Sequence, residues 1–118
     1  MTVKDFEHLI CEFMKSYKEK YGLVTDWRTP IVGVANANDE LFQMLKNIVG
    51  PTHVLPGDIV PNAKSVITFF IPFSRDIVLS NVENEESSKA WDYACIETNR
   101  MIGALSEYLY NVIRDTGV

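Results

Sequence analysis

The stretch from Pro61 to Pro72 constrains the fold most, because it is the most apolar window of the chain and has a proline at each end. Its centre, Val66 to Ile71, consists mainly of β-branched and aromatic residues, which are favoured in strands. Apolar side chains occupy both alternating sides of this run, whereas a strand with one solvated face alternates apolar and polar residues. The pattern predicts a central strand at about residues 65–71 that is buried on both faces.

A second apolar run predicts a neighbouring strand at about residues 31–35. Gly33 lies in its middle and marks either a close backbone approach or a bulge. Three amphipathic segments predict helices at about residues 3–21, 38–49 and 87–116, which are expected to cover the sheet. Their expected boundary residues are Thr2 with Asp5 and Gly22 for the first, Asn36 or Asn38 for the second, and Ser87 or Ser88 with Gly117 for the third.

These elements indicate an α/β (α+β) fold with a small sheet, in a single domain that spans residues 1–118. The connector at residues 50–64 is rich in proline and glycine but also carries apolar residues that would anchor it, so it predicts no domain boundary. A sheet of two strands is small for so hydrophobic a centre. The remaining neighbours of the central strand are therefore expected in further sequence or in another subunit.

Charge and hydropathy exclude several classes of function. The chain has 16 acidic and 11 basic residues, a net charge of −5, and its basic residues are scattered, which disfavours binding to nucleic acid. No apolar run approaches the roughly 20 residues that a membrane span needs. The N-terminus lacks the basic start and continuous apolar segment of a secretory signal, so a cytoplasmic location is expected.

The residues alone show no complete reaction centre. The chain contains no glycine-rich phosphate loop, no G-x-S-x-G elbow and no metal-binding cluster of cysteines or histidines. Three side chains beside the predicted strands are candidates for a cofactor or substrate pocket, namely His53, Asp58 and Arg75. Each also has a purely structural interpretation. His53 could be a loop histidine bonded to backbone, Asp58 a turn former and Arg75 a surface charge.

A series of short motifs resembles a known family. The most specific pieces are the loop GPTHVLP at Gly50–Pro56 and the turn PNAK at Pro61–Lys64, which leads into the apolar strand before Pro72-Phe73. Together the motifs resemble the N-terminal part of iron–sulfur proteins related to epoxyqueuosine reductase. The other matching segments are Trp27–Ala35 (WRTPIVGVA), Asp39–Phe42 (DELF) and Glu97–Arg100 (ETNR).

The resemblance implies an incomplete domain of the nitroreductase-like, cobalamin-binding type. Family members continue into a ferredoxin-like domain with [4Fe–4S] clusters, and the catalytic acid also lies beyond the part that this chain matches. Each such cluster needs four thiolates, whereas this chain has only Cys11 and Cys95, so the chain itself is expected to hold no metal and no cluster. Cobalamin is the further cofactor that the family implies.

The function that the resemblance implies is that of a scaffold and pocket portion of an iron–sulfur oxidoreductase, not catalytic alone. The alternative is a non-enzymatic module that forms homodimers or binds another protein. The expected partner is therefore a second copy or the missing C-terminal region. Whether the chain is a fragment or a natural stand-alone protein stays open at this point.

Overall fold

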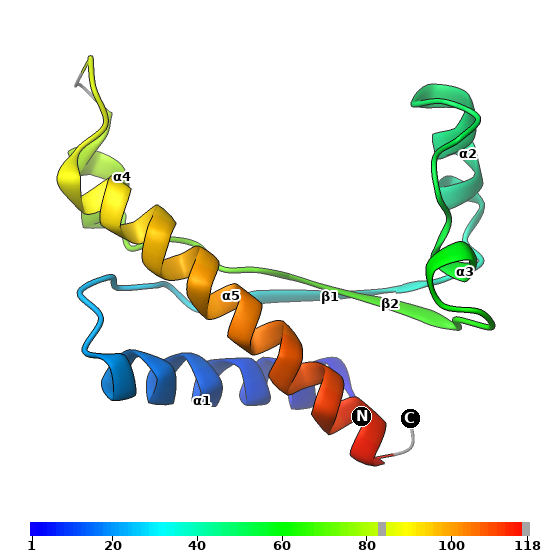
Figure 1. Cartoon of the computed structure of the whole chain (residues 1–118), viewed down its shortest axis with the longest axis horizontal. Helices are drawn as coiled ribbons and strands as arrows, with labels where there is room; N and C mark the ends of the chain where they lie inside the picture. The colour runs from blue at the N-terminus through cyan, green and yellow to red at the C-terminus, as the bar shows by residue number, and fades with distance from the viewer. Residues whose placement is uncertain (83–84, 117–118) are drawn as a thin grey trace. The chain divides into compact units, whose positions relative to one another are not determined.

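The computed structural model describes residues 1–82 and 85–116, which form five helices and one two-stranded antiparallel sheet (Figure 1). The mixed α+β character predicted from the sequence is confirmed. The chain divides into two compact units. We call Met1–Ile31 with Phe70–Val118 the helical unit, and Val32–Phe69 the sheet unit. None of the described helices is long and apolar enough to cross a bilayer.

The helical unit consists of α1 (Val3–Tyr21), α4 (Arg75–Ser80) and α5 (Lys89–Thr116). α5 packs against both α1 and α4 (Figure 1). The buried side chains recur at intervals of three or four residues along α1 and α5, as expected for helices that share one apolar interface. They are Phe6, Ile10 and Met14 on α1, and Ala94, Thr98, Met101, Leu105 and Leu109 on α5.

Local signals set the ends of the long helices. Thr2 and Asp5 form a reciprocal capping box at the start of α1, and Gly22 ends it in the left-handed conformation at φ 60°. The Ser88 hydroxyl accepts a hydrogen bond from the Trp91 amide at 3.1 Å, so Ser88 is the residue that caps α5. The predicted boundaries are thus confirmed, except that Gly117 lies outside the described residues.

The sheet unit contains α2 (Glu40–Ile48), α3 (Pro56–Ile59) and most of strands β1 (Ile31–Asn36) and β2 (Ser65–Phe70). Both strands lie within one residue of their predicted bounds. A Cβ atom placed on Gly33 would approach the Thr68 Oγ1 atom to 3.2 Å. Gly33 therefore marks a close approach across the strand pair rather than a bulge.

The prediction that the central strand is buried on both faces is wrong. The β2 residues are exposed or half-buried, and 62% of the Phe70 surface is exposed. Within Val32–Phe69, all of which the structure describes, only Val32 and Ala37 are buried apolar residues. The helices were predicted to cover the sheet, but no residue of β2 is buried. Two paired strands satisfy each other's backbone hydrogen bonds along one edge. Burial of a sheet face requires a further layer of structure packed on it.

The helix boundaries of this segment also need correction. Asp39 caps α2, because its Oδ1 accepts from the Leu41 amide at 2.9 Å, whereas the Asn36 side chain bonds the Asn38 amide at 2.8 Å. Helix α3 lies inside the connector at residues 50–64, where the sequence predicted no helix. The segment after β2 forms α4, a short helix that is not among the three helices predicted from the sequence.

Candidate functional site

The GPTHVLP and PNAK motifs are built by defined turns. The Ala63 amide donates to the Val60 carbonyl at 3.0 Å, and Asn62 between them has φ 64°. Pro61 followed by a residue with positive φ is the signature of a type II turn, and asparagine tolerates that conformation. In the other motif, the His53 amide donates to the Gly50 carbonyl at 3.1 Å and closes the turn that leaves α2.

Both motifs line one cavity of the sheet unit, with a volume of about 370 Å³. We call it the sheet-unit cavity. Its walls come from α2, the loop at residues 53–56, α3 and the start of β2, and they are almost wholly apolar. A few polar groups in an apolar hollow of this size are typical of small-molecule sites. The lining residues are Phe42, Leu45, His53, Val54, Leu55, Pro56, Ile59, Val60, Ala63, Ser65 and Val66.

His53 contributes the one imidazole ring of this wall. It is half-buried, and its Nδ1 lies 2.8 Å from the Val54 carbonyl oxygen. Because a carbonyl only accepts, Nδ1 must be the donor in this pair, which leaves Nε2 as the acceptor of the neutral imidazole. His53 therefore forms the hydrogen bond to backbone that is expected of a loop histidine, and it also lines the cavity.

The other two candidates lie elsewhere. Asp58 is exposed on α3, where its Oδ2 accepts from the Leu55 amide at 2.8 Å, so it stabilises the start of that helix. Arg75 is exposed at the first position of α4 and belongs to the helical unit. Neither is among the residues that line the sheet-unit cavity. The structure thus brings His53 and Asp58 into one unit and leaves Arg75 in the other.

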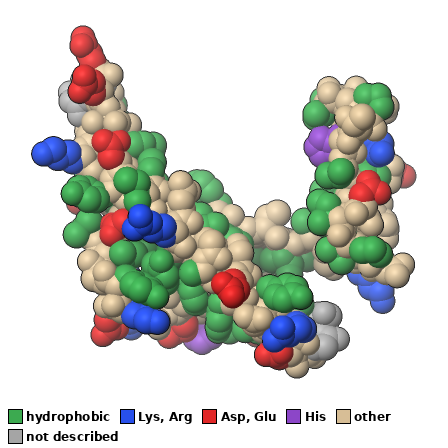
Figure 2. Space-filling model, in the orientation of Figure 1, with side chains coloured by type: hydrophobic (Ala, Val, Ile, Leu, Met, Phe, Trp, Pro, Cys, Tyr) green, Lys and Arg blue, Asp and Glu red, His purple; other side chains and the backbone are tan. Residues whose placement is uncertain are grey.

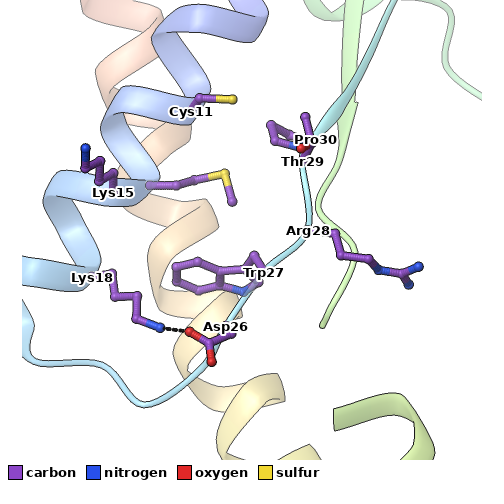
Figure 3. Close-up of a pocket in the computed structure, with 9 residues that line it drawn as sticks. Cys11, Lys15, Lys18, Asp26, Trp27, Arg28, Thr29 and Pro30 are labelled. Atoms are coloured by element: carbon purple, nitrogen blue, oxygen red, sulfur yellow. Dashed lines mark hydrogen bonds and ion pairs between the residues drawn. The ribbon is translucent and has the colours of Figure 1, made fainter. Parts of the chain in front are cut away.

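A smaller cavity, of about 260 Å³, lies in the helical unit between α1 and the segment Asp26–Pro30 (Figure 3). The Lys18 ammonium group forms an ion pair with Asp26 and also donates to the Thr25 carbonyl at 2.8 Å. The Arg28 side chain points away from Trp27 in Figure 3, and its Nε donates to the Phe73 carbonyl at 2.8 Å. These two cations are therefore already engaged with protein groups, whereas Lys15 is a third cation in the lining of this cavity.

Cys11 also lines this cavity and is half-buried. Burial raises the pKa of the Cys11 thiol above its ordinary value, and the carboxylates of Glu7 and Glu12 add to the rise. The thiolate is the nucleophilic form of cysteine, so this environment disfavours a reactive cysteine at neutral pH. The sheet-unit cavity is consequently the stronger candidate for a binding site.

Residues of the WRTPIVGVA and ETNR segments meet in the helical unit. The Glu97 Oε1 atom accepts from the Thr25 hydroxyl at 2.6 Å and from the Thr25 amide at 3.0 Å. The Trp27 Nε1 group donates to the Thr98 hydroxyl at 2.8 Å. These bonds fix the entry to β1 against α5, which gives Glu97 and Thr98 a structural role.

Within residues 1–82 and 85–116, no group of three or more His, Cys, Asp or Glu side chains is placed to hold a metal ion. Comparisons of the chain with protein-family models, with curated proteins and with solved structures found no match. Sequence reasoning identified His53 but missed the apolar walls that α2 contributes through Phe42 and Leu45. Their periodic spacing had indicated ordinary core packing, and nothing in the spacing distinguishes a core from a cavity wall.

Proposed function

We propose that this chain is the scaffold and pocket portion of an iron–sulfur oxidoreductase related to epoxyqueuosine reductase, with a nitroreductase-like, cobalamin-binding type of domain. One observation carries the proposal: His53 of the GPTHVLP loop and Ala63 of the PNAK turn line the same cavity. These are the most specific parts of the resemblance. Their convergence on one hollow supports a binding role for both motifs.

The residues present do not fit a [4Fe–4S] cluster. Such a cluster takes four thiolates, and this chain contains only Cys11 and Cys95, which lie on different helices and are both half-buried. The proposed oxidoreductase must therefore receive its clusters from protein outside this chain. The chain alone is proposed to bind and to position, and to carry out no turnover.

The sheet-unit cavity fits part of a large, flat cofactor better than a whole one. A corrin ring is wider than a hollow of about 370 Å³ can enclose, so this chain would supply one wall of the pocket. The wall offers apolar contact along α2 and α3 and two polar side chains, the imidazole of His53 and the hydroxyl of Ser65. Asp58 and Arg75 stay predictions as pocket positions, and neither lines this cavity.

Titration of the purified chain with cobalamin, followed by visible absorption, tests the proposal. We expect a saturable spectral change that weakens in the variant His53→Ala, which removes the imidazole from the cavity wall. The variant His8→Ala is the matched control, because His8 is exposed on α1 and lines no part of this cavity. An unchanged spectrum, or equal effects of the two substitutions, contradicts the proposal.

A second candidate is self-association, which the uncovered surface of the sheet unit favours. α2 buries none of its residues, and Leu41, Met44 and Ile48 form an exposed apolar stripe at intervals of three and four residues. Figure 2 shows hydrophobic side chains at the surface of the α2 and α3 segment. A second copy presents the same stripe and the same free strand edges, which suits a symmetric pair.

Light scattering on the purified chain tests this candidate. We expect the mass of a dimer for the natural sequence and the mass of one chain for Ile48→Asp, because 73% of the Ile48 surface is exposed and the substitution leaves the core intact. Ile96→Asp, at an exposed site on α5, should remain dimeric. A strict monomer at high concentration contradicts self-association.

A further inference from the structure

A third cavity lies between α1 and α5 in the helical unit and has a volume of about 390 Å³. It is distinct from the two cavities described above, and we call it the aromatic groove. Four aromatic side chains line it, three on successive turns of α1 and one on α5. These residues are Phe13, Tyr17, Tyr21 and Tyr108.

The four rings form a continuous series. Phe13 stacks on Tyr108 with ring centroids 5.0 Å apart, and on Tyr17 at 5.8 Å. Tyr17 lies 4.6 Å from Tyr21, whose surface is 56% exposed. The faces of aromatic rings carry negative electrostatic potential, so a surface built from them attracts cations.

The Lys20 side chain already uses this property. Its Nζ atom lies 5.2 Å from the centroid of the Tyr21 ring, within the range of a cation–π contact. Glu107 adds a carboxylate to the same groove. Neither Lys20 nor Glu107 has an ion-pair partner within the described residues. The groove therefore combines aromatic rings with one carboxylate and one ammonium group, neither of which has an ion-pair partner among the described residues.

We propose that the aromatic groove binds a small organic ammonium ion, of the quaternary type. The positive group would rest on the ring faces of Tyr17 and Tyr21 and lie near the Glu107 carboxylate, and it would compete with the Lys20 ammonium group. A quaternary ammonium ion suits such a surface better than a metal ion, because its methyl groups pack on apolar rings and its charge is weakly hydrated. This site is independent of the proposed cofactor pocket.

Choline is the probe for the first experiment, with 3,3-dimethylbutan-1-ol as its uncharged counterpart of the same shape. Binding is followed by NMR through the ring signals of Tyr17 and Tyr108, at constant ionic strength set with sodium chloride. Choline should shift these signals saturably, and the alcohol should not. Equal shifts by the two compounds would show apolar contact without charge recognition and would overturn the proposal.

Four variants sharpen the test. Glu107→Gln and Tyr17→Leu should each weaken choline binding about fivefold, because each removes an attraction worth about 1 kcal/mol. Lys20→Ala should tighten binding, because it removes the competing cation. Tyr93→Leu alters an exposed tyrosine of α5 outside the groove and should bind as the natural chain does. The proposal fails if Glu107→Gln and Tyr17→Leu bind choline normally, or if Tyr93→Leu loses binding as much as they do.

Discussion

The indole of Trp27 donates a hydrogen bond to the hydroxyl of Thr98 at 2.8 Å and so joins the segment before β1 to the buried face of α5. Thr98 is 5% exposed and is the polar member of an otherwise apolar stripe. A buried hydroxyl needs a partner, and this bond supplies one. It also accounts for a threonine at a position where the helix pattern alone would favour a larger apolar side chain.

Thr98→Val should therefore destabilise the chain by about 1 kcal/mol, because valine keeps the shape of threonine but leaves the indole N–H without its acceptor. Urea unfolding followed by circular dichroism measures the change. Thr98→Ser retains the hydroxyl and should recover part of the loss. Equal midpoints for the natural chain and Thr98→Val would show that the bond adds no stability.

Glu97→Ala should cost more, about 2–3 kcal/mol, because one carboxylate oxygen accepts from Thr25 twice and from the Val24 amide at 3.2 Å. The Thr25 hydroxyl is almost wholly buried and would lose its acceptor. Glu97→Gln keeps an acceptor oxygen without the charge. Its free energy of unfolding should therefore lie between those of the natural chain and Glu97→Ala. Urea unfolding gives the energies, and faster hydrogen exchange at the Thr25 amide would locate the effect.

The Asp5 carboxylate should make the stability of α1 depend on pH in the acid range. Hydrogen bonds from the Thr2 backbone, and then from its side chain, hold the pKa of the Asp5 carboxyl below its ordinary value. A folded-state pKa below the unfolded one contributes stability that is present above about pH 3.9 and is lost as the pH falls through the folded value. The difference in Tm between the natural chain and Asp5→Asn should accordingly shrink on acidification. A constant difference down to about pH 2 would contradict the capping role.

Cys11 should react slowly with iodoacetamide at mildly alkaline pH, because the raised pKa of its thiol keeps the thiolate scarce. Its alkylation rate should continue to increase with pH beyond the pKa range of ordinary cysteine thiols. Mass spectrometry of the Cys95→Ser variant isolates the signal of Cys11, and the same variant in urea is the unfolded reference. Equal native and unfolded rates would show that burial does not protect the thiol.

The parts of the fold that local chemistry determines could be predicted from the sequence. The capping residues Thr2, Asp5 and Gly22 define α1 completely, because each acts within one turn of the helix end. The burial of β2 could not be predicted in the same way. A run such as Val66 to Ile71 is compatible with burial, but only other elements can bury it.

The candidate site shows the same division. His53 could be named as a candidate from the sequence because it lies in a turn-rich loop beside the predicted strands. The aromatic groove was not, because Phe13, Tyr17 and Tyr21 at four-residue intervals look like the inner face of α1. Only the placement of Tyr108 and Glu107 on α5 shows that the far side of this face borders a hollow. Pairings between distant segments decide such sites, and helical periodicity carries no information about them.

The antiparallel bridge between Trp27 and Phe73 has a consequence for how the chain is assembled. The Arg28 amide donates to the Pro72 carbonyl and the Ser74 amide to the Asp26 carbonyl, both at 2.9 Å, so the polypeptide leaves the helical unit and returns to it through adjacent positions. Neighbouring strands lie only about 5 Å apart. A tight hairpin of a few residues could span that gap in place of Val32–Phe69. In modular terms, the sheet unit is an insertion, and the helical unit can keep its connectivity whether the insertion is long, short or exchanged for another.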